Sequence, residues 1–156
     1  ARVAVLDIDF HHGNGTQDIL YDRGDILFAS IHGAPEDCFP YFSGYADETG
    51  QGAGEGATLN LPLPPGTGAG DWMAALDTAL AAIRAARAEA LVVSLGVDAY
   101  VGDPISAFRL ESDDFTRAGA RIATAGPPAV FCMEGGYAIA AVGINTVNVL
   151  EGFAGG

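Results

Sequence analysis

An apolar segment near the start of the chain ends in a row of side chains that can bind metals or move protons. It reads VAVLDIDFHHGNGTQ over residues 3–17 and places Asp9 and His11 two positions apart, so both side chains leave an extended backbone on the same side. Asp98 follows a second apolar run, ALVVSLGV. Two carboxylates and one imidazole form a three-ligand set with an open fourth position, which is typical of a catalytic zinc site. The alternative is that both aspartates cap turns and that His11 is a hydrogen-bonded core residue.

Two more ionisable residues flank the Asp9–His11 pair. His12 points to the opposite side of the extended stretch, so it cannot readily join the same metal. Asp7 points to the same side as Asp9 and lies deeper along the run. It could orient the imidazole of His11, as histidine ligands usually require, or it could accept hydrogen bonds from local backbone amides. The sequence leaves both interpretations open.

Another apolar run leads into the segment Glu134–Tyr137, which contains two consecutive glycines. The glycines allow the backbone to turn sharply and to come close to a ligand. The phenol of Tyr137 could then donate a hydrogen bond to an oxyanion that develops beside a metal. The triplet GGY also occurs in ordinary turns, so this signal is weak alone. Asp103, shortly after Asp98, is a further carboxylate expected at the same edge.

Four apolar runs can form the sheet that brings these residues together. The runs are rich in Val, Ile, Leu and Phe and do not alternate with polar residues, which is typical of parallel strands covered on both faces. They span residues 2–8, 26–32, 90–97 and 128–135. Ligands of open parallel sheets bind at the carboxyl ends of the strands, and three of these runs end in the candidate residues.

Helical patterns lie between and after the runs. Helices are predicted over residues 16–22, 72–87, 113–125 and 139–153. Asp71 and Ser112 are expected to cap the second and third of them. The alternation of strands and helices predicts an α/β domain with a mainly parallel sheet flanked by helices. Between residues 33 and 70 we expect a long ordered loop.

Composition and charge exclude several classes of protein. The chain has 156 residues, enough for one domain with a core, and its net charge of −13 argues against a nucleic-acid partner. We expect neither a membrane-spanning segment, since no apolar run is long enough, nor a signal peptide. Cys38 and Cys132 are expected to be reduced thiols in a cytoplasmic protein, with Cys132 buried. The abrupt start without methionine suggests that an upstream segment has been removed.

In this order the motifs resemble the histone deacetylase superfamily, and most closely its bacterial acetylpolyamine amidohydrolase branch. The matching stretches cover nearly the whole chain: LDIDFHHGNGTQDILYDRGDILFASIHG, FPYFSGYADETGQGAGEG, VVSLGVDAYVGDPISAFRL and FCMEGGYAIAAVGINTVNVLEGFAG. The resemblance implies an α/β fold of the arginase-deacetylase type. Residues 1–156 would then form a single partial deacetylase domain, the C-terminal half of the catalytic domain.

The resemblance also implies two cation sites. A zinc ion would be held by Asp9, His11 and Asp98, and Tyr137 would be the phenol that stabilises the oxyanion. A potassium ion would lie behind the zinc loop, partly on main-chain carbonyls, near the residues Asp7, Ser30 and Ile31.

Two residues are assigned to a substrate channel on the same grounds. Phe42 would form an aromatic wall of the channel, with Phe39 as an alternative alignment. Ile105 would line the mouth of the channel. The alternatives are that Phe42 anchors its loop and that Ile105 is ordinary packing.

The general base expected in this family is absent from the chain. Members of the family carry it as a tandem histidine pair well upstream of the Asp-x-His strand. His11 is assigned to the metal, so His11–His12 is not that pair, and His32 has no neighbouring histidine. The sequence therefore predicts a zinc-dependent deacetylase acting on acetylpolyamines or acetyl-lysine, with the isolated chain a poor catalyst.

Two rival interpretations stay open. The chain could be a non-catalytic fragment that self-associates or needs a partner chain, such as the missing N-terminal half. It could also be an arginase-type manganese ureohydrolase, which would need a second set of carboxylates. Asp98 is followed by Ala99 and Tyr100, which cannot supply that set.

Overall fold

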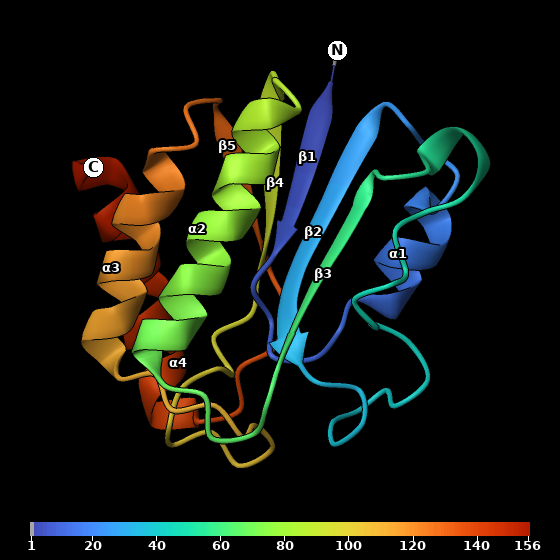
Figure 1. Ribbon diagram of the computed structural model, residues 1–156. Coiled ribbons are helices and arrows are strands. Elements are labelled where there is room, and N and C mark those ends of the chain that lie inside the picture. Colours follow the sequence, from blue (N-terminus) through green and yellow to red (C-terminus); the bar gives the residue numbers. More distant parts are fainter. Residues whose placement is uncertain (1) are drawn as a thin grey trace.

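The four predicted apolar runs form strands of one parallel sheet in a computed structural model that describes residues 2–156 (Figure 1). The sheet has five strands in the order β3-β2-β1-β4-β5, and all pairs are parallel. The strands are β1 Val3–Asp7, β2 Ile26–Gly33, β3 Thr58–Leu63, β4 Ala90–Leu95 and β5 Ala129–Met133. The α/β prediction with a parallel sheet is confirmed.

Strand β3 lies inside the segment 33–70, where a long loop was predicted, and that prediction is wrong in part. The segment pairs with β2 from Phe28↔Thr58 to Gly33↔Leu63. Its sequence TLNLPL alternates polar and apolar residues and contains Pro62, unlike the continuous apolar runs. Proline is tolerated because β3 is an edge strand whose outer amides have no sheet partner.

Helices follow the predicted segments, with shifted bounds; only the last helix starts at the predicted residue. They are α1 Asn14–Leu20, α2 Ala69–Ala85, α3 Ser112–Ala123 and α4 Ile139–Gly155, with a short 3-10 helix at Gly52–Gly54. The cap predictions at Asp71 and Ser112 are wrong: α2 starts after Gly68, which leaves Asp71 in its first turn. The N-cap of α3 is Glu111, whose backbone N–H donates to Asp114 Oδ2 at 2.7 Å.

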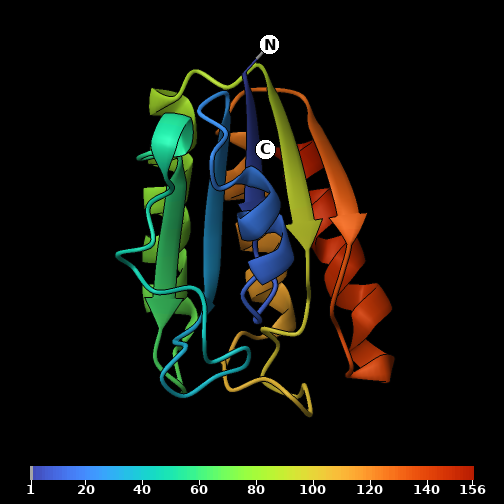
Figure 2. The same cartoon turned by 90° about the vertical axis from the view of Figure 1, so that its right-hand side faces the viewer.

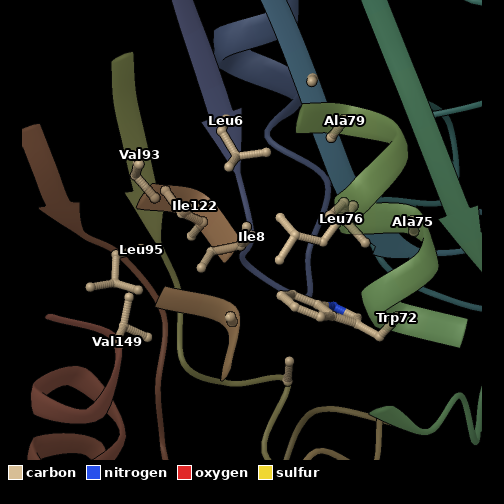
Figure 3. Close-up of a cluster of buried hydrophobic side chains, with 14 of the residues drawn as sticks. Leu6, Ile8, Trp72, Ala75, Leu76, Ala79, Val93, Leu95, Ile122 and Val149 are labelled. Carbon is tan, nitrogen blue, oxygen red and sulfur yellow. The ribbon is translucent and has the colours of Figure 1, made fainter. Parts of the chain in front are cut away.

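The core lies on one face of the sheet. Alternate residues of β1 and β4, such as Leu6 and Leu95, point to the same side, where they belong to one buried cluster with Trp72 and Leu76 of α2 (Figure 3). Ile122 of α3 and Val149 of α4 extend the same cluster. This packing holds the ends of β1, β4 and β5 in fixed positions, where the candidate residues follow.

The opposite face of the sheet is covered unevenly. Figure 2 shows α1 in front of the middle of the sheet, and no helix of residues 2–156 in front of β5. On that side Val130 is 62% exposed and Cys132 is also exposed. The prediction of a buried Cys132 is therefore wrong, because β5 is an edge strand with one bare face. No helix in the described part of the chain is long and apolar enough to span a bilayer.

Candidate metal centre

Asp9, His11 and Asp98 come together at the carboxyl ends of β1 and β4. One possible ligand atom from each lies within 4.8 Å of the other two. His11 Nδ1 is 2.9 Å from Asp98 Oδ2 and 3.3 Å from Asp9 Oδ1. Within residues 2–156 this is the one group of its kind, so a second set of carboxylates, as an arginase-type site needs, is not found there.

Backbone amides fix both carboxylates of this triad. Asp98 Oδ1 accepts the N–H of Phe10 at 2.8 Å, which ties β4 to the loop after β1. Asp9 Oδ2 accepts the N–H of Gly135 at 2.8 Å, and Asp9 Oδ1 accepts the N–H of His11 at 2.8 Å. The carboxylate of each aspartate is thus oriented by at least one amide from another segment of the chain. Such preorganisation is what a metal site needs from its surroundings.

Gly135 is required by the closeness of these contacts. A Cβ at this position would lie 2.5 Å from Asp9 Oδ2 and 2.8 Å from Asp98 Oδ2. Any other residue would push the carboxylates apart. The glycine pair that the sequence showed before Tyr137 therefore serves a close backbone approach to the triad.

Burial and hydrogen bonds shift the pKa values of all three residues of the triad. Hydrogen bonds to Asp9 and Asp98 raise the pKa of His11 from 6.5 to about 9. Burial raises the pKa of Asp98 to about 6, although the bond to His11 opposes the rise. Burial also acts to raise the pKa of Asp9, but hydrogen bonds from His11 and Gly135 outweigh it and lower that pKa. Two carboxylates around one imidazole nitrogen fit a divalent cation, and zinc accepts both donor types.

A cavity of about 830 Å³ opens beside the triad. Phe39, Ile105 and Tyr137 line it together with His11. The ring of Phe39 lies edge-on to that of His11, with centroids 6.3 Å apart. Phe42 lines a separate cavity instead, so of the two aromatic alignments only Phe39 borders the triad.

Tyr137 is half-exposed in the same cavity, and no side-chain hydrogen bond holds its phenol among the described residues. Burial, together with Asp9 and Asp98, raises the pKa of its hydroxyl. The phenol therefore stays protonated at neutral pH and can donate a hydrogen bond.

Asp7 is the last residue of β1, deeper in the sheet than the triad, and it contacts backbone rather than His11. Its Oδ1 accepts the N–H of Asp9 at 3.1 Å, which is the second of the two interpretations left open by the sequence. Burial raises the pKa of Asp7 well above its ordinary value. Ser30 pairs with Asp7 in the sheet, and Ile31 follows in the core. These three residues are thus adjacent and buried, as a cation site behind the triad would require.

The other two histidines lie in a buried polar network away from the triad. His12 Nε2 contacts Gln17 Oε1 at 3.1 Å, and its ring centroid is 4.5 Å from that of His32. His32 Nε2 donates to the carbonyl of Gly44 at 2.8 Å, and its Nδ1 is 2.8 Å from Ser30 Oγ. Both contacts of His32 suit a neutral imidazole. No pattern in the sequence indicated that His12 and His32 would be neighbours.

His32 makes the stability of the chain depend on pH. Burial lowers its pKa from 6.5 to about 4, so between these values the unfolded chain binds a proton that the folded chain does not. The free energy of unfolding is expected to fall by on the order of 3 kcal/mol as the pH drops from about 6.5 to about 4. Urea unfolding of wild type and His32→Gln measures this: the advantage of wild type should shrink toward pH 4. A difference that stays constant with pH would contradict it.

Sequence reasoning missed Gly96, and it expected Asp103 at this edge without giving it a role. Gly96 has no room for a side chain, because a Cβ would lie 2.5 Å from the Cα of Asp9. The carboxylate of Asp103 accepts backbone amides next to Tyr137. Both residues lie in the loop after β4, and their roles follow only from their contacts in the folded structure.

The chain is similar to known proteins over its whole length. Residues 1–153 match the family model described as the histone deacetylase domain. The chain is 61% identical to acetylpolyamine amidohydrolase 1 of Pseudomonas aeruginosa and 54% identical to the acetylpolyamine amidohydrolase of Mycoplana ramosa, each over 154 residues. These alignments cover 99% of this chain but 44% and 45% of the relatives.

A solved structure gives the same picture. The crystal structure of acetylpolyamine aminohydrolase from Burkholderia pseudomallei superposes with a TM-score of 0.94 at 42% identity. The superposition covers 99% of this chain and 45% of that chain. The chain thus spans less than half the length of the relatives it matches.

Proposed function

The chain belongs to the histone deacetylase family and has the family's arginase-deacetylase type of α/β fold; on this premise we propose that it forms the metal-binding part of a zinc-dependent amidohydrolase. The reaction would release acetate from acetylated amines. The observation that carries the proposal is the triad of Asp9, His11 and Asp98 beside a cavity that Asp9 and His11 line together with Tyr137.

Six residues in or beside the cavity would take part in this reaction. Asp9, His11 and Asp98 would hold zinc, which when bound lowers the pKa of water and polarises a carbonyl. Tyr137 would donate its hydroxyl proton in a hydrogen bond to the oxyanion that forms on the acetyl carbonyl. Phe39 and Ile105 present apolar surfaces to the acyl chain at the rim.

Asp7, Ser30 and Ile31 would hold a potassium ion behind the zinc. The support is that Asp7 and Ser30 are register partners on β1 and β2, both buried, with Ile31 next in the chain. A monovalent cation there would offset the negative charge that Asp7, Asp9 and Asp98 place at one end of the sheet.

The substrate we propose is a small acetylated amine such as an acetylpolyamine, with an acetyl-lysine peptide as the second choice. The net charge of −13 favours a cationic ligand over an anionic one, and the relatives named above are acetylpolyamine amidohydrolases. Cys38 and Cys132 are both free thiols, which supports a reducing compartment such as the cytoplasm.

A general base would have to come from outside residues 2–156. Of the three histidines, His11 belongs to the triad, while His12 and His32 are buried and burial lowers the pKa of both. None of them is an exposed base beside the open side of the zinc position. Loss of a general base costs about 10²–10⁴-fold in rate, so the chain alone should be a poor catalyst.

The remaining part of the domain would pack on an exposed surface of β5 and α4. This surface is formed by Val130 and Cys132 on β5 and by Ile144, Val147 and Leu150 on α4. The side chains of this surface are apolar or weakly polar, and all five are exposed. Figure 2 shows β5 and α4 together at one edge of the molecule. Parallel sheets are normally covered on both faces, so we propose that the remaining part of the deacetylase domain packs here, with a second copy of the chain as the alternative.

A complementation assay tests both the function and the docking surface. The chain is co-expressed with the part of the Pseudomonas aeruginosa relative that the alignment leaves uncovered, and acetate release from acetylputrescine and an acetyl-lysine peptide is measured with zinc. Activity should exceed that of the chain alone by at least about 100-fold. Val130→Asp should prevent complementation, whereas Ala81→Asp on the outer side of α2 should not.

The possible outcomes separate the claims. If the chain alone is as active as the co-expressed pair, the claim that the general base lies outside residues 2–156 is wrong. A zinc-loaded complex without deacetylation would refute the function. Light scattering that shows a dimer of the chain, broken by Val130→Asp, would favour the second copy as the occupant.

A further inference from the structure

Asp103 lies in the loop after β4 and accepts hydrogen bonds from two different segments. Its Oδ2 accepts the backbone N–H of Tyr137 at 2.7 Å and that of Ala138 at 3.2 Å. Its Oδ1 accepts the backbone N–H of Ile105 at 3.1 Å. The residue is 7% exposed, so these bonds are shielded from water and count more than surface contacts would.

The segment from Gly135 to Ala138 is thereby held at both ends. The N–H of Gly135 donates to the triad residue Asp9, and the N–H groups of Tyr137 and Ala138 donate to Asp103. Gly136, between them, has a φ of 150°, which only glycine adopts readily. A short and otherwise pliable turn is therefore tied to the triad on one side and to Asp103 on the other.

Ala138 is also the residue before α4, and it has no side-chain cap of its own. The carboxylate of Asp103, from a distant part of the sequence, lies at this end of the helix and accepts the N–H groups of Ala138 and of the residue before it. A negative charge at this end of the helix is favourable because the first amides of a helix carry partial positive charge. This gives the start of α4, and with it Tyr137, a defined place.

We propose that Asp103 is the positioning residue that sets the phenol of Tyr137 relative to the metal triad and joins it to Ile105 at the rim. The inference deepens the proposed function, on which the role of Tyr137 rests. Asp103 does not line the cavity and would touch neither substrate nor metal. It acts through the backbone of two residues that do line it.

The three bonds require a carboxylate. An amide side chain has one acceptor oxygen, so Asp103→Asn can satisfy Tyr137 and Ala138 or Ile105, but not both sides. Its NH₂ group would then face a backbone N–H. Asp103→Asn should therefore lie between wild type and Asp103→Ala in every measurement. Asp113→Asn, an exposed substitution in the first turn of α3, is the matched control.

Amide hydrogen exchange on the zinc-free chain tests the positioning directly. Asp103→Ala should speed exchange at Tyr137 and Ala138 by about tenfold or more, with Asp103→Asn intermediate and Asp113→Asn unchanged. Amides of β1 and β4 should keep their protection if the variant stays folded. Unchanged exchange at Tyr137 and Ala138 in Asp103→Ala would overturn the proposal.

A double-mutant cycle then asks whether Asp103 acts through the phenol. Binding of acetohydroxamic acid to the zinc-loaded chain should weaken about tenfold in Asp103→Ala and in Tyr137→Phe. The double variant should be no weaker than Tyr137→Phe alone, with zinc content equal in all four proteins. Fully additive losses would refute action through Tyr137. If the probe does not bind to wild type, the proposed zinc chemistry fails while the exchange result still decides the positioning.

Discussion

Asp98→Asn is expected to weaken zinc binding more than about 100-fold while leaving the chain folded. Asp98 Oδ1 accepts the N–H of Phe10 and Oδ2 faces His11 Nδ1, so one oxygen serves the fold and the other serves the triad. An asparagine can keep the first contact through its oxygen, but it then presents an NH₂ group to the metal position. Since loss of a partner behind a metal ligand already costs 10–100-fold in affinity, loss of a ligand should cost more. Competition with a zinc-binding dye measures the change.

Tyr137→Phe is the matched control for this prediction. Tyr137 lines the same cavity but contributes no donor to the triad, so its removal should change zinc affinity by less than about threefold. Equal losses in Asp98→Asn and Tyr137→Phe would show that the three-residue assignment is wrong. Circular dichroism on both variants checks that a loss of zinc binding is not caused by unfolding.

The sequence predicted the triad because its signal is local and repeated. Asp9 and His11 are two apart on one extended stretch, and the apolar runs before them and before Asp98 are continuous enough to predict parallel strands, which the structure shows to be neighbours. The sheet rule then brings the two strand ends together without any knowledge of side-chain contacts. The roles of the potassium and channel residues rest on the resemblance and stay predictions.

Other features of the structure have no local signal. Strand β3 alternates in a proline-containing stretch, so it resembled a loop until its pairing with β2 was seen. Phe39 and Phe42 are chemically identical and close in sequence, and only the path of the loop decides which one faces His11. The exposure of Cys132 depends on what lies beside β5, which the composition of that strand cannot report. Each of these depends on contacts between segments distant in sequence.

Gly119→Ala is expected to lower the free energy of unfolding by about 3 kcal/mol, because α3 and α4 touch through their backbones. A Cβ at Gly119 would lie 2.0 Å from the carbonyl oxygen of Val149 and 2.8 Å from the amide nitrogen of Phe153. The reciprocal contact exists at Gly152, where a Cβ would lie 2.1 Å from the carbonyl oxygen of Thr116. Backbone atoms cannot rotate away as a side chain can, so the helices must separate.

Gly143→Ala in α4 separates this effect from helix propensity. A Cβ at Gly143 meets nothing within 4 Å, so alanine there should raise the free energy of unfolding by up to about 1 kcal/mol. Urea unfolding should thus move in opposite directions for the two glycines, and a Gly119→Ala variant as stable as wild type would mean that the helices do not cross this closely. The result also bears on the site. Tyr137 lies just before the start of α4, so a displaced α4 should raise amide exchange at Tyr137 while the triad in the loops after β1 and β4 keeps its zinc.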